Sequence, residues 1–185
     1  MLRRTIPRAV EAGVNLDRLL GLAVGMLSVL VVGVILMTQA APSEVGPDRA
    51  AAAYMLELVN EVRATEGLAP LEPAADITVV AERWSAQMAD DQDMRHNPDF
   101  ADEICCWLLA TENVAWSEPH RIWRPGDPVR RITDELHEAL LSSPSHRENL
   151  LDASVDQVGI GIHVDRDGNV WITQNFRRAT QTAPS

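Results

Sequence analysis

The sequence predicts an α+β domain preceded by a single membrane-spanning helix. Three observations lead to this prediction: an uncharged apolar run near the N-terminus, helical periodicity through the middle of the chain, and alternating strands near the C-terminus. Helices followed by an antiparallel hairpin are typical of folds in which helices pack on a sheet. A chain of 185 residues is long enough for one such domain with a well-formed core.

Residues 19–37 contain no charge, and Ser28 is their only polar side chain. As a helix this run would be about 28 Å long, close to the thickness of the hydrocarbon core of a bilayer. Arginine dominates the charges of residues 1–18, so we expect that segment in the cytoplasm and the remainder outside a cell membrane that the chain crosses once. The run is longer than a typical signal-peptide core, which favours an uncleaved signal anchor. Cleavage near Ala40, which would release a secreted protein, is the alternative.

Beyond the anchor, residues 38–47 form a linker with several helix-breaking residues, residues 48–178 form the exported domain, and residues 179–185 form a tail. Apolar positions spaced three or four apart, together with capping residues, predict four helices in the domain. They run from Asp48 to about Glu66, from about Ala74 to Asp91, from Asp127-Pro128 onwards, and over a short segment with a capping box of Ser145 and Glu148.

Strands are expected mainly late in the chain, where apolar residues alternate with small or polar ones. Gly159 and Gly161 leave one side of the first late strand bare, so a helix can approach it closely. The expected strands are residues 113–116, 158–164 and 170–176, with a hairpin turn at Asp167-Gly168.

The composition is strongly acidic. There are 27 Asp and Glu residues against 16 basic residues, all of them arginine, and the formal net charge is −11. An acidic surface repels phosphate backbones, so we expect no nucleic-acid partner. The simplest explanation of the acidity is solubility.

His96, Glu112 and His146 come from three different predicted elements and can together form one polar cleft. Neutral imidazoles can ligate Zn²⁺ or another divalent cation, which makes His96 and His146 the candidate metal ligands. Glu112 is then either a third ligand or the group that orients a ring. Without a metal, the residues could perform His–Glu acid–base chemistry, or form only a buried network that ties loops to the sheet.

Several segments resemble the bacterial branch of the CAP superfamily (SCP/PR-1-like; cysteine-rich secretory protein, antigen 5 and pathogenesis-related 1). These segments are LVNEVRATEGLAPLEP, AERWSAQMA, RHNP, TENVAWS, SSPSHRENLLDASVDQVGIGI and WITQNF, and they cover roughly residues 50–177 in the family's order. The resemblance implies a three-layer α-β-α sandwich with an antiparallel sheet, so residues 48–178 are expected to be a CAP domain.

The resemblance also implies that His96, Glu112 and His146 line the family's cleft, with Asn113 as a further ligand-binding residue. The second glutamate of many eukaryotic members would fall near Ser143, so the set of four is incomplete here. Three smaller departures concern the surrounding motifs: Thr111 and Ser145 stand where glycine is usual, and Leu140 stands where tryptophan is common.

We therefore expect a membrane-anchored, extracytoplasmic CAP-domain protein that binds a small or lipid-like ligand, or a peptide, with a divalent cation such as Zn²⁺ as an optional cofactor. A His/Glu-dependent or metal-assisted hydrolase is one alternative. A cell-envelope interaction module without chemistry is another. No activated nucleophile is evident in the sequence, and the missing second acidic residue favours binding over catalysis.

Cys105 and Cys106 are adjacent and are the only cysteines of the chain. Neighbouring Cα atoms lie about 3.8 Å apart, below the usual range for a disulfide, so a bond between the two would be strained. Two buried thiols, or an intermolecular link in an oxidising compartment, are the alternatives.

Overall fold

The computed structural model describes residues 47–118 and 127–180. Within these ranges no helix has the length and apolar character needed to cross a bilayer. The expected membrane segment at residues 19–37 lies outside the described residues, so the anchor stays a prediction.

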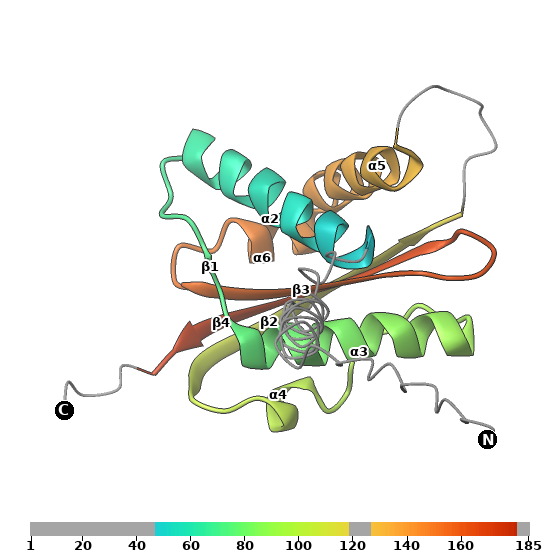
Figure 1. The fold of residues 1–185 in the computed structure, drawn as a ribbon. Coiled ribbons are helices and arrows are strands. Elements are labelled where there is room, and N and C mark those ends of the chain that lie inside the picture. Colours follow the sequence, from blue (N-terminus) through green and yellow to red (C-terminus); the bar gives the residue numbers. More distant parts are fainter. Residues whose placement is uncertain (1–46, 119–126, 181–185) are drawn as a thin grey trace, which may run out of the picture. The chain divides into compact units, whose positions relative to one another are not determined.

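A four-stranded sheet lies between two layers of helices (Figure 1), which confirms the expected three-layer α+β architecture. The strand order is β1-β3-β4-β2. The helices α2, α5 and α6 cover one face, and α3 and α4 lie on the other. The helices are α2 (Pro47–Thr65), α3 (Ala75–Asp91), α4 (Phe100–Glu103), α5 (Pro128–Ser142) and α6 (Pro144–Leu150), and the strands are β1 (Glu72–Pro73), β2 (Trp107–Ser117), β3 (Gln157–Val164) and β4 (Val170–Ala179).

The sheet is mixed, so the expectation of an antiparallel sheet was wrong in one respect. β2, β4 and β3 pair antiparallel, but β1 runs parallel to β3. Main-chain hydrogen bonds from Glu72 to Asp156 and from Ala74 to Val158 hold β1 in place, each 3.0 Å long. A strand of two residues that contains a proline has no alternation to detect, and an edge position tolerates the missing N–H of Pro73.

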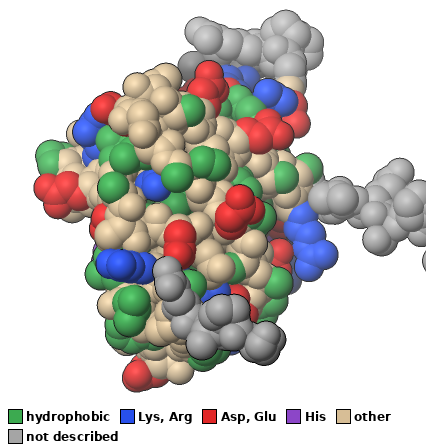
Figure 2. Space-filling view, turned by 90° about the vertical axis from the view of Figure 1, so that its left-hand side faces the viewer, with side chains coloured by type: hydrophobic (Ala, Val, Ile, Leu, Met, Phe, Trp, Pro, Cys, Tyr) green, Lys and Arg blue, Asp and Glu red, His purple; other side chains and the backbone are tan. Residues whose placement is uncertain are grey.

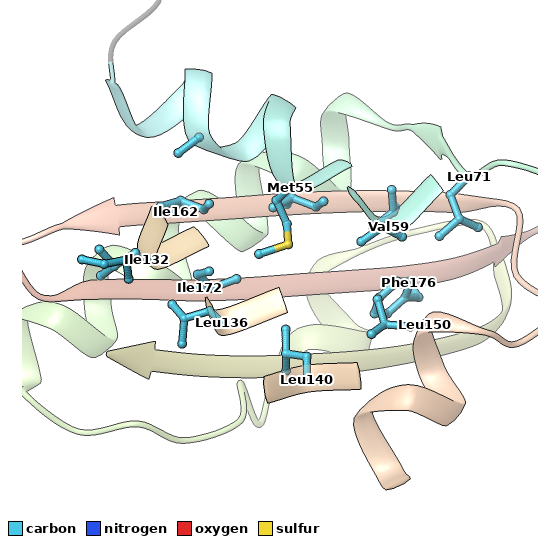
Figure 3. Close-up of a cluster of buried hydrophobic side chains, with 14 of the residues drawn as sticks. Met55, Val59, Leu71, Ile132, Leu136, Leu140, Leu150, Ile162, Ile172 and Phe176 are labelled. Carbon is cyan, nitrogen blue, oxygen red and sulfur yellow. The ribbon is translucent and has the colours of Figure 1, made fainter. Parts of the chain in front are cut away.

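The main hydrophobic core fills the space between the sheet and the α2/α5/α6 layer (Figure 3). Met55 and Val59 of α2 and Ile172 of β4 are fully buried in it. Side chains of this size each contribute about 1.5–3 kcal/mol when they are buried. Leu150, at the end of α6, is also fully buried, so the core fixes the short helix that carries His146.

Arg63 of α2 also fixes the C-terminal end of α6. Its guanidinium is 1% exposed and donates to the carbonyls of Leu150 (2.9 Å) and Asp152 (3.0 Å). One carbonyl belongs to the last residue of a seven-residue helix and the other lies just beyond it, where main-chain acceptors lack helical partners. The position of α6 is therefore set by a buried charged hydrogen-bond donor as well as by apolar packing.

On the opposite face, α3 packs directly on β3, as the two glycines of that strand predict. A Cβ atom added to Gly161 would lie 2.2 Å from the carbonyl carbon of Ala81, and one added to Gly159 would lie 2.4 Å from that of Ile77. Neither helix nor strand can move away without losing core contacts, so only glycine fits at these two positions.

The helix starts agree with the prediction in one case and differ in another. The Asp127 side chain caps α5 by accepting hydrogen bonds from Val129 and Arg130, as expected. The predicted capping box of Ser145 was wrong, because α6 begins at Pro144 and Ser143 takes the cap position without a side-chain bond. Proline favours the first position of a helix, which moves the start back from Ser145.

On the face of the molecule shown in Figure 2, acidic and arginine side chains are interspersed with hydrophobic ones. That face carries no continuous basic patch among the described side chains.

Candidate functional site

The structure brings Glu112 and His96 into direct contact. His96 follows α3 in a loop, and its ring Nδ1 lies 2.8 Å from Oε1 of Glu112, which is on β2. The main-chain N–H of Asn97 donates to the same oxygen at 2.9 Å. The His96 side chain is 63% exposed, whereas that of Glu112 is 6% exposed, so a buried carboxylate holds a ring that solvent can reach.

His146 approaches this pair from the other face of the sheet. Side chains alternate along β2, so Glu112 faces the α3 layer and Asn113 faces α6. Because β2 is an edge strand, groups from both faces can meet around its free edge. The main-chain carbonyl of His146 accepts a hydrogen bond from Asn113, which follows Glu112 in β2, and the charge of His96 is one cause that lowers the pKa of His146. The three residues predicted from the sequence therefore gather at the middle of β2.

Burial and neighbouring groups set the protonation of the site. Burial is the largest cause and raises the pKa of Glu112, while the hydrogen bonds from Asn97 and His96 act in the opposite direction. Burial, followed by the proximity of His96, lowers the pKa of His146. A neutral His146 ring keeps a lone pair that can bind a cation or accept a hydrogen bond.

Asn113 faces α6, on the opposite side of the sheet from Glu112, and positions that helix. It is fully buried, and its amide nitrogen donates to the main-chain carbonyl of His146 (3.1 Å) and to Gln174 (3.2 Å). Its side-chain oxygen accepts a bond of 2.8 Å from Asn149. All of these partners belong to the protein, so the structure gives Asn113 a positioning role.

Asn149 and Gln174 are site residues that our sequence reasoning missed. Asn149 also reaches the main-chain carbonyl of Glu112, at 3.3 Å, and so ties α6 to the edge of β2. The available signal was their place in the motifs SHRENL and TQNF, beside residues already singled out.

A family model described as CAP, the cysteine-rich secretory protein family, matches residues 56–176 of the chain. The chain belongs to this family. The matched range contains the whole His96–Glu112–His146 cluster, hereafter called the CAP cleft after the cleft that the family resemblance implies. No curated protein sequence matches the chain significantly.

Solved structures share the CAP fold. An extracellular SCP-domain protein from Bacillus anthracis has 24% identity and a TM-score of 0.57, over 75% of this chain and 44% of that one. An outer surface protein from Borrelia burgdorferi has 17% identity and a TM-score of 0.57, over 71% and 95%. NaASP2, solved with Zn²⁺, has 9% identity and a TM-score of 0.53, over 79% and 88%. At these identities the likeness shows the fold alone, and this chain spans less than half of the B. anthracis protein.

Buried polar atoms without a protein partner are concentrated around the CAP cleft. Among the described residues, the side chains that carry such atoms are Thr111, Glu112, Gln174, Asn175 and, elsewhere, His137. The first four lie at three successive paired positions of β2 and β4: Thr111 opposite Phe176, Glu112 opposite Asn175, and Asn113 opposite Gln174. Buried polar groups need hydrogen bonds, so this part of the CAP domain is suited to holding ordered water or a polar ligand.

The side chains of the CAP cleft meet the requirements of a metal site only in part. No cluster of three or more His, Cys, Asp or Glu side chains in residues 47–118 and 127–180 is arranged to hold an ion. Oε1 of Glu112 is already engaged with His96 and Asn97. Glu112 thus orients a ring, and the CAP cleft offers two imidazoles, one fewer than a typical catalytic zinc site.

A second hollow of the CAP domain lies between α2 and α3, against the edge of β3. It measures about 530 Å³ and is lined mainly by apolar side chains such as Leu56, Val79 and Ile160. Arg49 and Glu82 also line it and form an ion pair of 3.2 Å between the two helices. The sequence reasoning did not anticipate this groove, because its walls come from elements that only the tertiary fold brings together.

Proposed function

We propose that this chain is a membrane-anchored, extracytoplasmic protein whose CAP domain binds a small ligand or a peptide in the CAP cleft, with a divalent cation such as Zn²⁺ held by His96 and His146. The observation that carries the proposal is the contact of 2.8 Å between His96 and the buried Glu112, with His146 close by on the opposite face of the edge strand.

The chemistry of the three side chains supports ligation. When Nδ1 of His96 donates to Glu112, the lone pair of Nε2 is left for a ligand, and the carboxylate fixes the ring orientation. His146 is neutral near pH 7 because burial and His96 lower its pKa. Two imidazoles leave coordination positions for water or for a ligand atom, so we expect weak, exchangeable cation binding.

The similar proteins support the proposal by analogy. One is described as extracellular, one as an outer surface protein, and NaASP2 was solved with Zn²⁺. The first two descriptions agree with an exported domain, and the third agrees with a protein of this fold that binds a cation. The predicted anchor at residues 19–37 would keep the domain at the outer side of the cell membrane.

Zinc titration by calorimetry tests the proposal on the full chain in mild detergent. We expect wild-type protein to bind about one Zn²⁺, His96→Ala and His146→Ala each to weaken binding at least about 10-fold, and the double variant to show no binding. His163→Ala is the matched control, because His163 pairs with Asp48 at 3.7 Å, away from the cleft. Absence of heat with wild-type protein would overturn the cation part of the proposal.

The hydrolase alternative is tested on the same samples with a panel of ester and peptide substrates. The observation that favours a hydrolase is the His96–Glu112 pair, in which burial raises the pKa of the carboxyl group. Such a pair can act as a general base. Hydrolysis that is lost in His96→Ala would replace the binding proposal with this alternative. Hydrolysis that persists in that variant would come from another source.

Location is tested separately. The intact mass of the membrane-extracted protein distinguishes an uncleaved anchor from cleavage near Ala40. Protease added to intact cells should digest the CAP domain and leave residues 1–18 protected. Protection of the domain would contradict the expected orientation.

A further inference from the structure

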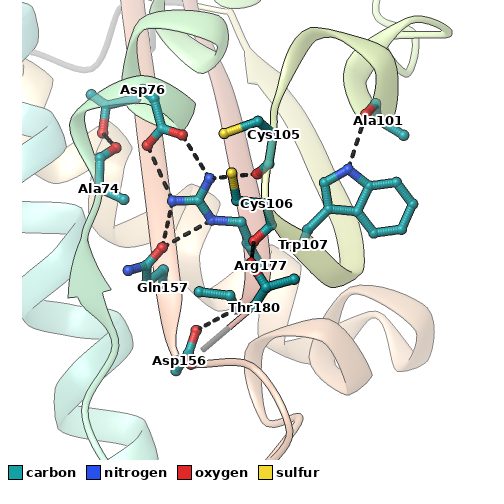
Figure 4. Close-up of polar contacts among 12 residues, drawn as sticks. Ala74, Asp76, Ala101, Cys105, Cys106, Trp107, Asp156, Gln157, Arg177 and Thr180 are labelled. Atoms are coloured by element: carbon teal, nitrogen blue, oxygen red, sulfur yellow. Dashed lines mark hydrogen bonds and ion pairs between the residues drawn. The ribbon is translucent and has the colours of Figure 1, made fainter. Parts of the chain in front are cut away.

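Cys105 and Cys106 stand between α4 and β2, on the α3 side of the sheet, and both thiols are free and exposed. Their exposure removes one of the alternatives drawn from the sequence, two buried thiols. Cys106 has a φ of +62°, in the left-handed region that residues other than glycine seldom adopt. Figure 4 shows both sulfur atoms on the same side of the chain, beside the guanidinium of Arg177, whereas neighbouring side chains in a strand point to opposite sides.

The carbonyl of Cys105 belongs to a polar clamp around the buried side chain of Arg177 (Figure 4). Arg177 is 6% exposed and donates to the carbonyl oxygen of Cys105 at 3.0 Å. The same guanidinium donates to both carboxylate oxygens of Asp76 (2.6 and 3.1 Å) and to Gln157. The clamp joins the first turn of α3, the start of β3 and the end of β4. The main chain of Thr180 donates to Cys106 at 2.8 Å beside it.

We propose that Cys105 and Cys106 form a reversible intramolecular disulfide and that its closure loosens the Arg177 clamp. The ring closed by the disulfide contains the peptide unit whose carbonyl accepts the bond from Arg177. Closing a small ring constrains the plane of that peptide unit, so the carbonyl cannot keep its present direction. The lost bond is one to a charged group, which is among the stronger hydrogen bonds in proteins.

Exchange with a low-molecular-weight disulfide such as oxidised glutathione accomplishes the oxidation. One cysteine thiolate attacks a glutathione sulfur, the glutathione S–S bond breaks, and one glutathione thiolate leaves. The neighbouring thiolate then attacks the mixed disulfide and releases the second glutathione thiolate. The two cysteines lose two electrons and two protons, and glutathione gains both.

Three features favour an internal bond over a link between two chains. The partner thiol is adjacent, so its effective concentration far exceeds that of a second protein molecule. The two thiols lie close together, since the neighbouring Cys106 side chain is the largest cause that raises the pKa of Cys105. Both copies in a dimer would carry a net charge of −11. Strain in the small ring keeps the bond easy to reduce, as befits a reversible switch.

The test treats the full chain, in mild detergent, with oxidised glutathione and then with dithiothreitol. We expect a mass lower by about 2 Da, no thiol left for iodoacetamide, and full reversal on reduction. Cys105→Ser and Cys106→Ser are the matched controls, and each should instead gain a single glutathione. A covalent dimer, or wild-type protein that retains two glutathiones, would overturn the internal bond.

Two further measurements test whether the disulfide loosens the hydrogen bonds of the Arg177 clamp. We expect the oxidised protein to melt about 5 °C lower than the reduced protein, and the amide of Thr180 to exchange its hydrogen faster. An internal bond that leaves both the melting temperature and this exchange rate unchanged would overturn the link to Arg177.

Discussion

Glu112 and Asn175 lie opposite each other on β2 and β4, on the same face of the sheet, and each keeps buried polar atoms without a protein partner. Side chains at such paired positions have Cβ atoms about 5 Å apart, close enough for one water molecule or ligand hydroxyl to bridge them. The face of the sheet turned toward α3 therefore carries buried polar atoms without protein partners beside His96.

This arrangement predicts a cost for Asn175→Leu. The apolar side chain has a similar volume but cannot bond to a water or ligand hydroxyl, so the bridge that we expect between this position and Oε2 of Glu112 is lost. We expect the free energy of unfolding to fall by about 1–3 kcal/mol in urea titrations. In the background of Glu112→Leu the same substitution should cost much less, and equal costs in the two backgrounds would refute the bridge.

Glu112→Gln should change how stability depends on pH. Because burial is the largest cause and raises the pKa of Glu112, the folded state binds this proton more tightly than the unfolded chain does. The contribution of Glu112 to stability is thus greatest below its unfolded pKa, about 4.3, and declines as the pH rises through the folded pKa. The variant should lack this contribution, so the difference in melting temperature, wild type minus variant, should grow on acidification. Parallel curves from pH 4 to 7 would contradict the assignment.

His96→Gln should raise the pKa of His146. Burial is the larger cause of the lowered value and remains in the variant, but the influence of the His96 ring is removed. Titration of the imidazole proton resonances by NMR measures the shift. His137 serves as an internal control, since burial lowers its pKa and His96 is not among the causes. An unchanged His146 would show that the rings do not interact.

Gly161→Ala should destabilise the domain strongly. The new Cβ would overlap the main chain of α3 at Ala81, so the helix must shift, at an expected cost of about 3 kcal/mol or more. Gly67→Ala is the matched control: it has a φ of +73° but no atom within 4 Å of an added Cβ, so it should cost only about 1 kcal/mol. Equal losses in chemical denaturation would mean that the close approach of α3 is not the cause.

Local patterns predicted those parts of the fold that depend on short-range physics. Asp127 was identified as a cap because its side chain can reach main-chain N–H groups two and three residues ahead, and it does so. The bare side of Gly159 and Gly161 predicted the approach of a helix without saying which helix. By contrast, Ser145 satisfied a capping pattern that Pro144 overrode, because proline fits the first turn of a helix better.

The three residues of the cleft were predicted from the sequence, but the role of each was not. Glu112 could have been a ligand or a group that orients a ring, and only its contacts with His96 and Asn97 decide for the second role. Asn113 follows Glu112 in the chain, yet the alternation of a strand turns it to the opposite face, where it holds the main chain of His146.

By itself the sequence determined the three longer helices and the hairpin, because periodicity, capping and turn chemistry act over a few neighbouring residues. Its motifs also named the candidates for the cleft. Only the tertiary structure decided which strand lies at the edge of the sheet and which buried polar atoms near Glu112 lack a protein partner. It also decided that Arg177 donates a hydrogen bond to the carbonyl of Cys105. These features join residues far apart in the chain. Their energies depend on burial and on distances that the order of amino acids does not state.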